Sequence, residues 1–192
     1  PNEGGVLILH AAPSILTTLA DGDCGSLPLT NCEDANASFA DLPLQFQAAI
    51  LAVFPSNGAT RLKAVTFGLD YDSERISITA INPCGEFDLP DAGWPNPGTG
   101  TAVAWDLPQT STIVEVYGFL AYCDAGVPIE LALTGHPTQG AYFGDDSVPS
   151  QLDAIADLGA LGFGQSGYLP CPATLPEGAC CFEDGHCEVQ SA

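Results

Sequence analysis

The chain has 192 residues, of which 24 are acidic and three are basic, so its formal net charge is −21. Three cations cannot release enough counterions from a phosphate backbone or cover an anionic bilayer, which excludes nucleic-acid binding and anionic-membrane binding. Because 46% of the residues are hydrophobic, the chain can bury a sizeable core and is not a disordered acidic tail.

The start of the chain indicates processing. The sequence contains no Met and begins with Pro1, so we expect that a secretory signal peptide has been removed. The longest candidate apolar stretch covers residues 48–54, which is far shorter than the roughly 18 residues of a membrane-spanning helix. The sequence therefore predicts a secreted, extracellular protein that does not insert into a membrane and that could sit at the cell surface.

Short apolar runs separated by turn residues follow one another along the chain. Residues 6–9 have the pattern of a strand covered on both faces, and the polar segment 17–41 is typical of a long loop. Residues 44–54 suit a helix by their alanines and a strand by their large side chains, so both remain open. Alternation over 61–71 and 75–81 predicts a hairpin with an acidic turn.

The second half of the chain continues this pattern. Prolines over 82–100 predict a long loop, and β-branched and aromatic residues predict strands over 101–105, 112–123 and 129–133. One short helix is expected over 150–158, and irregular structure over the glycine-rich 159–167. Seven or eight strands with little helix predict an all-β fold, an antiparallel two-sheet sandwich of the jelly-roll type, over residues 1–170.

Eight cysteines in an exported chain indicate disulfides. Zinc is the competing interpretation, but it requires C-x2-C pairs, and the sequence has none. Spacing favours Cys24–Cys32 as a local bridge and Cys84–Cys123 as a bridge within the core. Residues 171–192 then form a disulfide-stapled appendage whose cysteines pair among themselves: Cys171, Cys180, Cys181 and Cys187.

Carboxylates and one tryptophan are the candidates for ligand binding. Asp70, Asp72 and Glu74 alternate through the predicted turn, where their oxygens could converge on Ca²⁺, the one cofactor that the sequence suggests. An ordinary acidic turn is the alternative. Trp94 in the long loop is a candidate stacking platform for a glycan, or else it folds back over the edge of the core, because large aromatic residues are mostly buried.

Patterns of catalytic residues are weak. The histidines, His10, His136 and His186, are far apart and form no metal-binding motif. Residues 162–167 match G-x-G-x-x-G but lead into a tail rich in proline and cysteine, whereas a dinucleotide site needs a helix there. The sequence therefore predicts that the protein is not an enzyme, and a secreted hydrolase is the weakest of three functional hypotheses.

The leading hypothesis is a non-enzymatic extracellular structural protein that associates with itself at the cell surface or in a filament. The only cations, Arg61, Lys63 and Arg75, fall on one predicted hairpin and could contact the acidic face of a neighbouring copy, or else pair with nearby acids of their own chain. An N-terminal strand could also complete a neighbour's sheet, or else pair within its own; it consists of Val6, Leu7, Ile8 and Leu9. The alternative hypothesis is a secreted carbohydrate- or calcium-binding module.

The C-terminal segment, GACCFEDGHC over residues 178–187, resembles the G-A-C-C-x2-D-G-x-C units of uncharacterised secreted bacterial proteins. Residues 5–10 (GVLILH) and 136–140 (HPTQG) are also similar to such proteins. The resemblance implies export and cysteine pairing, and it implies no activity. Because the unit can recur in those proteins and occurs once here, we expect that the chain ends inside a longer precursor.

Overall fold

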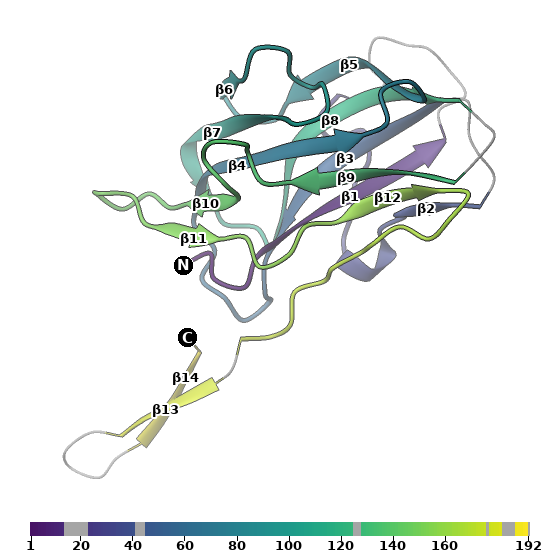
Figure 1. Ribbon diagram of the computed structural model, residues 1–192. Helices are drawn as coiled ribbons and strands as arrows, with labels where there is room; N and C mark the ends of the chain where they lie inside the picture. Colours follow the sequence, from purple (N-terminus) through teal and green to yellow (C-terminus); the bar gives the residue numbers. More distant parts are fainter. Residues whose placement is uncertain (14–22, 41–44, 125–127, 176, 182–186, 192) are drawn as a thin grey trace.

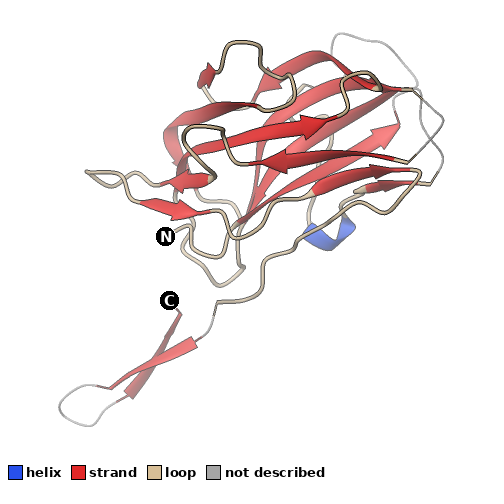
Figure 2. Cartoon of the chain, in the orientation of Figure 1, coloured by secondary structure: helices blue, strands red, loops and turns tan. Residues whose placement is uncertain are grey.

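The computed structural model describes residues 1–13, 23–40, 45–124, 128–175, 177–181 and 187–191, the last two ranges by their backbone alone. As the sequence predicts, the fold is an all-β, jelly-roll-like sandwich of two sheets (Figures 1 and 2). The one helical element in these ranges is a short 3-10 turn, η1 (Cys32–Asp34). None of the described helices is long and apolar enough to cross a membrane.

The first sheet has four strands and contains the N-terminal strand. The strand order is β1-β3-β8-β5, and all three pairings are antiparallel. The strands are β1 (Val6–Pro13), β3 (Gln45–Val53), β8 (Ile113–Cys123) and β5 (Ile76–Pro83). In the ambiguous segment 44–54, residues 45–53 therefore form a strand, because they pair with β1 on one edge and with β8 on the other.

The second sheet has eight strands, and it branches at β4 (Leu62–Tyr71) because two strands share one edge of β4. One edge of β4 pairs with β7 along its length, and the other edge pairs first with β10 and then with β9. β6 and β11 extend the sheet beyond β7 and β10, while β12 and β2 extend it beyond β9. The remaining strands are β2 (Ser38–Phe39), β6 (Phe87–Pro90), β7 (Thr99–Gln109), β9 (Ile129–Thr134), β10 (Tyr142–Gly144), β11 (Leu152–Ala154) and β12 (Ala160–Phe163).

Near the C-terminus, a separate two-stranded sheet is formed by β13 (Glu177–Cys181) and β14 (Cys187–Ser191). Its register places Cys181 opposite Cys187. Among the strand pairs that the structure describes, only β12 and β2 run parallel.

Four expectations about individual elements are wrong. The predicted hairpin does not form, because β4 and β5 belong to different sheets, and the turn at Asp72–Arg75 carries the chain from one sheet to the other. The expected helix over 150–158 contains instead the strand β11, which pairs with β10. The expected irregular segment 159–167 contains β12, and the expected loop 82–100 contains β6.

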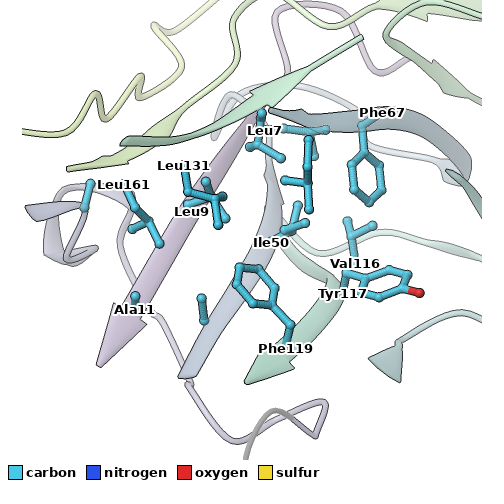
Figure 3. Packing of buried hydrophobic residues seen from close by; sticks show 14 of the residues in the cluster. Leu7, Leu9, Ala11, Ile50, Phe67, Val116, Tyr117, Phe119, Leu131 and Leu161 are labelled. Carbon is cyan, nitrogen blue, oxygen red and sulfur yellow. The ribbon is translucent and has the colours of Figure 1, made fainter. Parts of the chain in front are cut away.

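One hydrophobic core fills the space between the two sheets (Figure 3). The eight-stranded sheet contributes inward residues such as Phe67, and the four-stranded sheet contributes residues such as Phe46, both fully buried. The ring centroid of Phe46 lies 4.8 Å from that of Phe163, so the sheets meet through aromatic contacts. Truncating a ring of this kind to alanine typically costs about 3–5 kcal/mol of unfolding free energy.

A second, smaller core covers the outer face of β1 and β3. Val6, Ile8 and Leu51 pack there against Leu27 and the buried Cys32. The four-stranded sheet is thus buried on both faces at this edge, which explains why its first strand is continuously apolar instead of alternating. One consequence is that the four-stranded sheet is covered at its β1–β3 edge, whereas the large apolar residues of the eight-stranded sheet stay exposed.

Candidate functional site

The outer face of the eight-stranded sheet carries two rows of outward residues that cross five strands. β6, β7, β4, β10 and β11 follow one another across this sheet (Figure 1). Side chains alternate between the faces of a strand, so residues that pair directly across these strands share one face. One row is Phe87, Ala104, Ala64, Gly144 and Leu152. The other row is Leu89, Ala102, Thr66, Tyr142 and Ala154.

These two rows, which we call the apolar face, have large side chains at both margins. On β6, Phe87 is 57% exposed and Leu89 is 71% exposed. On the opposite margin, Tyr142 of β10 is 38% exposed and Leu152 of β11 is 65% exposed. These four are half of the eight large hydrophobic residues exposed in the described part of the chain. Isolated exposed hydrophobics are ordinary, whereas a contiguous group of them marks an interaction surface.

Between the margins, the apolar face has a floor of small residues. Alanines of β4 and β7 and Gly144 of β10 occupy the central positions. A hollow of about 280 Å³ opens over the part of this floor between β4 and β11, and its lining includes Ala64, Thr66, Tyr142 and Leu152. A Cβ placed on Gly144 would lie 3.5 Å from Leu152 Cδ2, so the leucine side chain stands at the side of the floor. The apolar face is therefore a shallow trough with raised margins.

Two of the three cations lie at one end of this trough, at the start of β4. Arg61 Nε donates a hydrogen bond to Asp146 Oδ1 at 2.7 Å, and Arg61 Nη2 pairs with the second carboxylate oxygen. This hydrogen bond, together with the charge of the guanidinium, lowers the pKa of Asp146. Lys63 Nζ donates to the carbonyl oxygen of Asp106. Both cations therefore interact with their own chain.

The other end of the trough is bordered by the loop 135–140. Gly140 lies beneath the ring of Tyr142, because a Cβ at residue 140 would lie 2.7 Å from Tyr142 Cε2. His136 lies over Gly100 of β7, where a Cβ would come within 2.7 Å of the imidazole. Glycine is needed at both positions to let this loop close down on the sheet. The loop thus limits the length of the trough.

The predicted assembly cations do not form one patch. Arg61 and Lys63 lie at the start of β4, whereas Arg75 follows its far end and pairs with Asp72 at 3.6 Å. The ten residues of β4 separate these ends by about 33 Å. The grouping in the sequence is therefore lost in space, because β4 and β5 do not fold back on each other as a hairpin.

The predicted assembly strand, Val6 to Leu9, pairs within its own sheet, the alternative that the sequence left open. All four residues are buried, and β1 is in register with β3. The outer edge of β1 is also occupied, because Leu7 N donates to Asp157 O and Gly159 N donates to Leu7 O. Transfer of this strand to a neighbouring copy would break these bonds and open the second core.

The acidic turn does not gather its carboxylates as a calcium site would. Asp72 instead accepts a hydrogen bond from the backbone N–H of Glu74 and faces Arg75, while Asp70 projects from β4. In the described ranges, the one group of three ligand-bearing side chains within 4.8 Å is Cys24, Cys84 and Glu115. The two sulfurs of this group are joined in a disulfide, and none of the predicted calcium ligands belongs to the group. The predicted ligands therefore have the geometry of an ordinary acidic turn.

Trp94 folds back over the core edge, which was the alternative to a glycan platform. Its ring centroid lies 5.6 Å from that of Phe67 and 5.8 Å from that of Tyr117, with both contacts edge-to-face. Its indole Nε1 donates to the Tyr117 hydroxyl at 3.1 Å, and that hydroxyl donates to Asp88 Oδ2. The indole is therefore a packed component of a polar network and is partly buried.

Both predicted disulfide pairings in the body of the chain are wrong. The structure joins Cys24 to Cys84, so the loop after residue 22 is attached to the end of β5. It joins Cys32 to Cys171, so Cys171 does not pair within the C-terminal appendage. Cys123 is a buried free thiol, whose pKa is raised by burial. The side chains of Cys180, Cys181 and Cys187 lie outside the described part.

The described histidines have structural roles. His10 Nδ1 accepts the backbone N–H of Asn36 at 2.9 Å, and burial lowers the pKa of its imidazole. His136 Nδ1 accepts the backbone N–H of Thr138, while its Nε2 lies 3.6 Å from Asp91 Oδ2. His186 falls outside the described ranges. Each of the two imidazoles thus fixes a loop against a strand.

Sequence reasoning missed the large residues of the apolar face. Phe87 and Leu89 fall in the segment interpreted as a proline-rich loop, and Leu152 falls in the segment interpreted as a helix. The available signal was the alternation in Phe87–Pro90 and in Leu152–Ala154, where apolar residues stand on either side of an aspartate. Strands this short give too few periods for the alternation to be decisive.

No family model matches this sequence, and no curated protein matches it. Solved structures that are similar include cohesin modules. The cohesin module of a family 33 glycoside hydrolase from Clostridium perfringens is 13% identical with a TM-score of 0.49, covering 67% of this chain and 89% of that chain. A cohesin from a type I cohesin–dockerin complex of Clostridium thermocellum is 6% identical with a TM-score of 0.49, covering 83% and 98%. A non-cellulosomal cohesin from Archaeoglobus fulgidus is 11% identical with a TM-score of 0.43, covering 67% and 86%.

Proposed function

We propose that this protein is a non-enzymatic extracellular module that binds another protein through the apolar face. The observation that carries the proposal is the set of four large exposed hydrophobics, Phe87, Leu89, Tyr142 and Leu152, standing around a floor of small residues. The opposite sheet of the same molecule is covered at one edge by its own chain. A sheet face left open in this way has an interaction partner as its simplest explanation.

Two further features support an extracellular setting. Cys24–Cys84 and Cys32–Cys171 close loops across the fold, and such bridges persist in oxidising compartments. The formal charge of −21 keeps the chains apart in solution. Repulsion of this kind allows an open apolar face to exist on an individual chain without general aggregation.

The shape of the trough favours a partner with a narrow projecting element over a second copy of this chain. A two-fold pair would bring the same surface of both copies together. With the axis over the floor, large margins would meet large margins and the small floors would face each other across a gap. The trough from β6 to β11 spans four strand spacings, or about 19 Å between the outermost strands, and the side chains at its margins leave room for one secondary-structure element of a partner.

The proposal is tested with variants that remove the margins. Immobilised wild-type chain is used to capture proteins from the extracellular fraction of the source culture, and the captured protein is purified and titrated. The double variant Leu89→Ser/Leu152→Ser should weaken its Kd at least tenfold, which corresponds to about 1.4 kcal/mol, because it removes one large apolar contact from each margin of the face.

A matched pair of tyrosines provides the control. Tyr142 on the apolar face is 38% exposed, and Tyr122 on the four-stranded sheet is 39% exposed. Tyr142→Ser should weaken binding of the captured protein, whereas Tyr122→Ser should leave it unchanged. Equal binding by all variants would show that the apolar face is not the docking site.

Sedimentation of the wild-type chain alone tests self-association, the leading expectation from the sequence. A dimer that the substitution Leu89→Ser disperses would identify a second copy as the occupant of the apolar face.

A further inference from the structure

The apolar face is neutral, but its surroundings are acidic. Glu86 precedes Phe87 on the β6 margin, and its Oε2 accepts the backbone N–H of Asp106 at 2.9 Å. These two exposed carboxylates therefore stand together at one corner of the face. Asp70 is exposed further along β4. Asp70 lies beyond the loop 135–140 that ends the trough, so a partner that fills the trough must bring its own edge close to Glu86 and Asp106.

Of the two cations near the face, Arg61 is neutralised by an ion pair, whereas Lys63 binds a neutral carbonyl oxygen and keeps its charge. Arg61 is bound by Asp146 through both oxygens, and Lys63 Nζ is bound by the Asp106 carbonyl. Recruiting either cation to an acidic partner would first break a contact within this chain. Over the whole chain, 24 acidic residues stand against three basic ones. The field of the chain as a whole is consequently negative, and among the described residues Lys63 is the cation that partly offsets Glu86 and Asp106 at the corner of the face.

This charge pattern distinguishes between possible occupants. A second copy carries the same charge of −21, and its acidic corner would approach another acidic surface within the Debye length of about 8 Å at physiological salt. Like charges placed across an interface are costly, whereas complementary charges steer association and select the partner. In a pair of identical copies, these carboxylates would face other carboxylates. A partner with lysine or arginine beside its apolar residues would instead place positive charges next to them.

We propose that the natural partner of the apolar face is a cationic protein, one that presents apolar side chains flanked by lysine or arginine. This inference rests on the proposed function and specifies the chemistry of the partner at the same site. The apolar contacts supply affinity, and Glu86 and Asp106 set the preference for positive flanks. Bulk attraction to a chain of net charge −21 would not depend on the apolar face, and this difference makes the inference testable.

The test uses two fluorescein-labelled 15-residue peptides of identical leucine and alanine pattern, one with lysine and the other with glutamate at the remaining positions. Fluorescence anisotropy with the full chain at about 150 mM salt measures both affinities. The lysine peptide should bind at least tenfold more tightly than the glutamate peptide. Leu89→Ser/Leu152→Ser should lower that affinity at least tenfold at unchanged net charge, whereas Tyr122→Ser should not change it. Glu86→Gln/Asp106→Asn should lower the affinity for the lysine peptide alone.

Three results would overturn the inference. They are failure of both peptides to bind, equal binding of the two peptides, and lysine-peptide binding that is unaffected by the leucine substitutions. The last result would mean attraction to bulk charge only. The capture experiment with the purified extracellular protein is read separately. If that protein binds through the leucines but is itself acidic, the proposed function stands and the cationic-partner inference fails.

Discussion

Cys32 and Cys171 stand 139 positions apart in the sequence and are joined by a disulfide on the outer side of the four-stranded sheet. Cys32 is buried in the smaller core, and the segment after Cys171 continues to Leu175, whose N–H donates to Asn57 Oδ1 at 2.9 Å. The disulfide thus fixes residues 171–175 against the body of the fold. It helps to cover the β1–β3 edge of the four-stranded sheet, on the side of the sandwich away from the apolar face.

Removal of this bridge should reduce stability substantially. We expect Cys32→Ser/Cys171→Ser to lower the unfolding free energy by about 2–5 kcal/mol, because the unfolded chain gains conformational freedom. Its loop is longer than the loop of Cys24–Cys84, which closes over a separation of 60. The chain-entropy model therefore makes the first loss larger by about 0.7 kcal/mol. Urea unfolding of both double variants measures the two losses.

Peptide mapping without reduction checks the pairing itself. Fragments linking Cys24 to Cys84 and Cys32 to Cys171 are expected. A fragment linking Cys24 to Cys32, as the spacing in the sequence suggested, would contradict the arrangement described here.

The Trp94–Tyr117–Asp88 network should contribute measurably to stability. Tyr117→Phe removes the acceptor of the indole N–H and a donor to Asp88, and a buried polar group left without a partner costs about 1–3 kcal/mol. The Trp94 fluorescence spectrum should shift as well, because its polar partner is lost. Tyr122→Phe, on an exposed ring of the same strand, β8, should stay within about 0.5 kcal/mol. Equal losses in the two variants would count against the network.

Asp145 should make the fold sensitive to acid. Its Oδ1 accepts the Ser147 hydroxyl at 2.6 Å and the Gln151 N–H at 2.7 Å, and these bonds, led by the hydroxyl, lower the pKa of the carboxyl group. A carboxyl group with a lowered folded-state pKa contributes stability above its unfolded pKa of about 3.9, and that stability is lost as the pH falls through the folded value.

The corresponding measurement is Tm against pH for Asp145→Asn. The variant should melt below the wild type at pH 7, and the difference should shrink below about pH 4 as the wild-type carboxyl protonates. Asp70→Asn, at an exposed position of β4, controls for the general effect of removing one negative charge. A difference that stays constant from pH 7 to pH 3 would mean that Asp145 is not the titrating group.

The sequence was sufficient for the class of fold and for most long strands. Continuous apolar residues at β1, alternation over β4, and β-branched and aromatic residues over β7 and β8 were enough to predict these strands. The connection of β4 to β5 could not be predicted in the same way. Residues such as Phe67 and Ile76 point into the core of the folded protein. The same residues would be buried if β4 and β5 formed a hairpin within one sheet, so the alternation of apolar residues does not distinguish the two arrangements.

The candidate site could not be predicted from the sequence, because it depends on very short strands and on contacts between strands that are distant in the chain. Phe87 and Leu152 lie on strands of four and three residues, too short to show a period, and they become neighbours of one surface only through β7, β4 and β10. The disulfides depended on the same non-local arrangement, since Cys32 and Cys171 are brought together by the packing of distant segments over β1 and β3. Export and cysteine pairing, in contrast, could be argued from composition alone.

Carbene footprinting of the purified complex tests the central claim most directly. The full chain is labelled with a photoactivated diazirine, alone and saturated with the protein captured from the extracellular fraction. The account predicts that Phe87, Leu89, Tyr142 and Leu152 lose labelling in the complex, while Tyr122 and Tyr168, exposed elsewhere, keep theirs. Unchanged labelling of the four residues, with protection at Tyr122 or Tyr168, would contradict it.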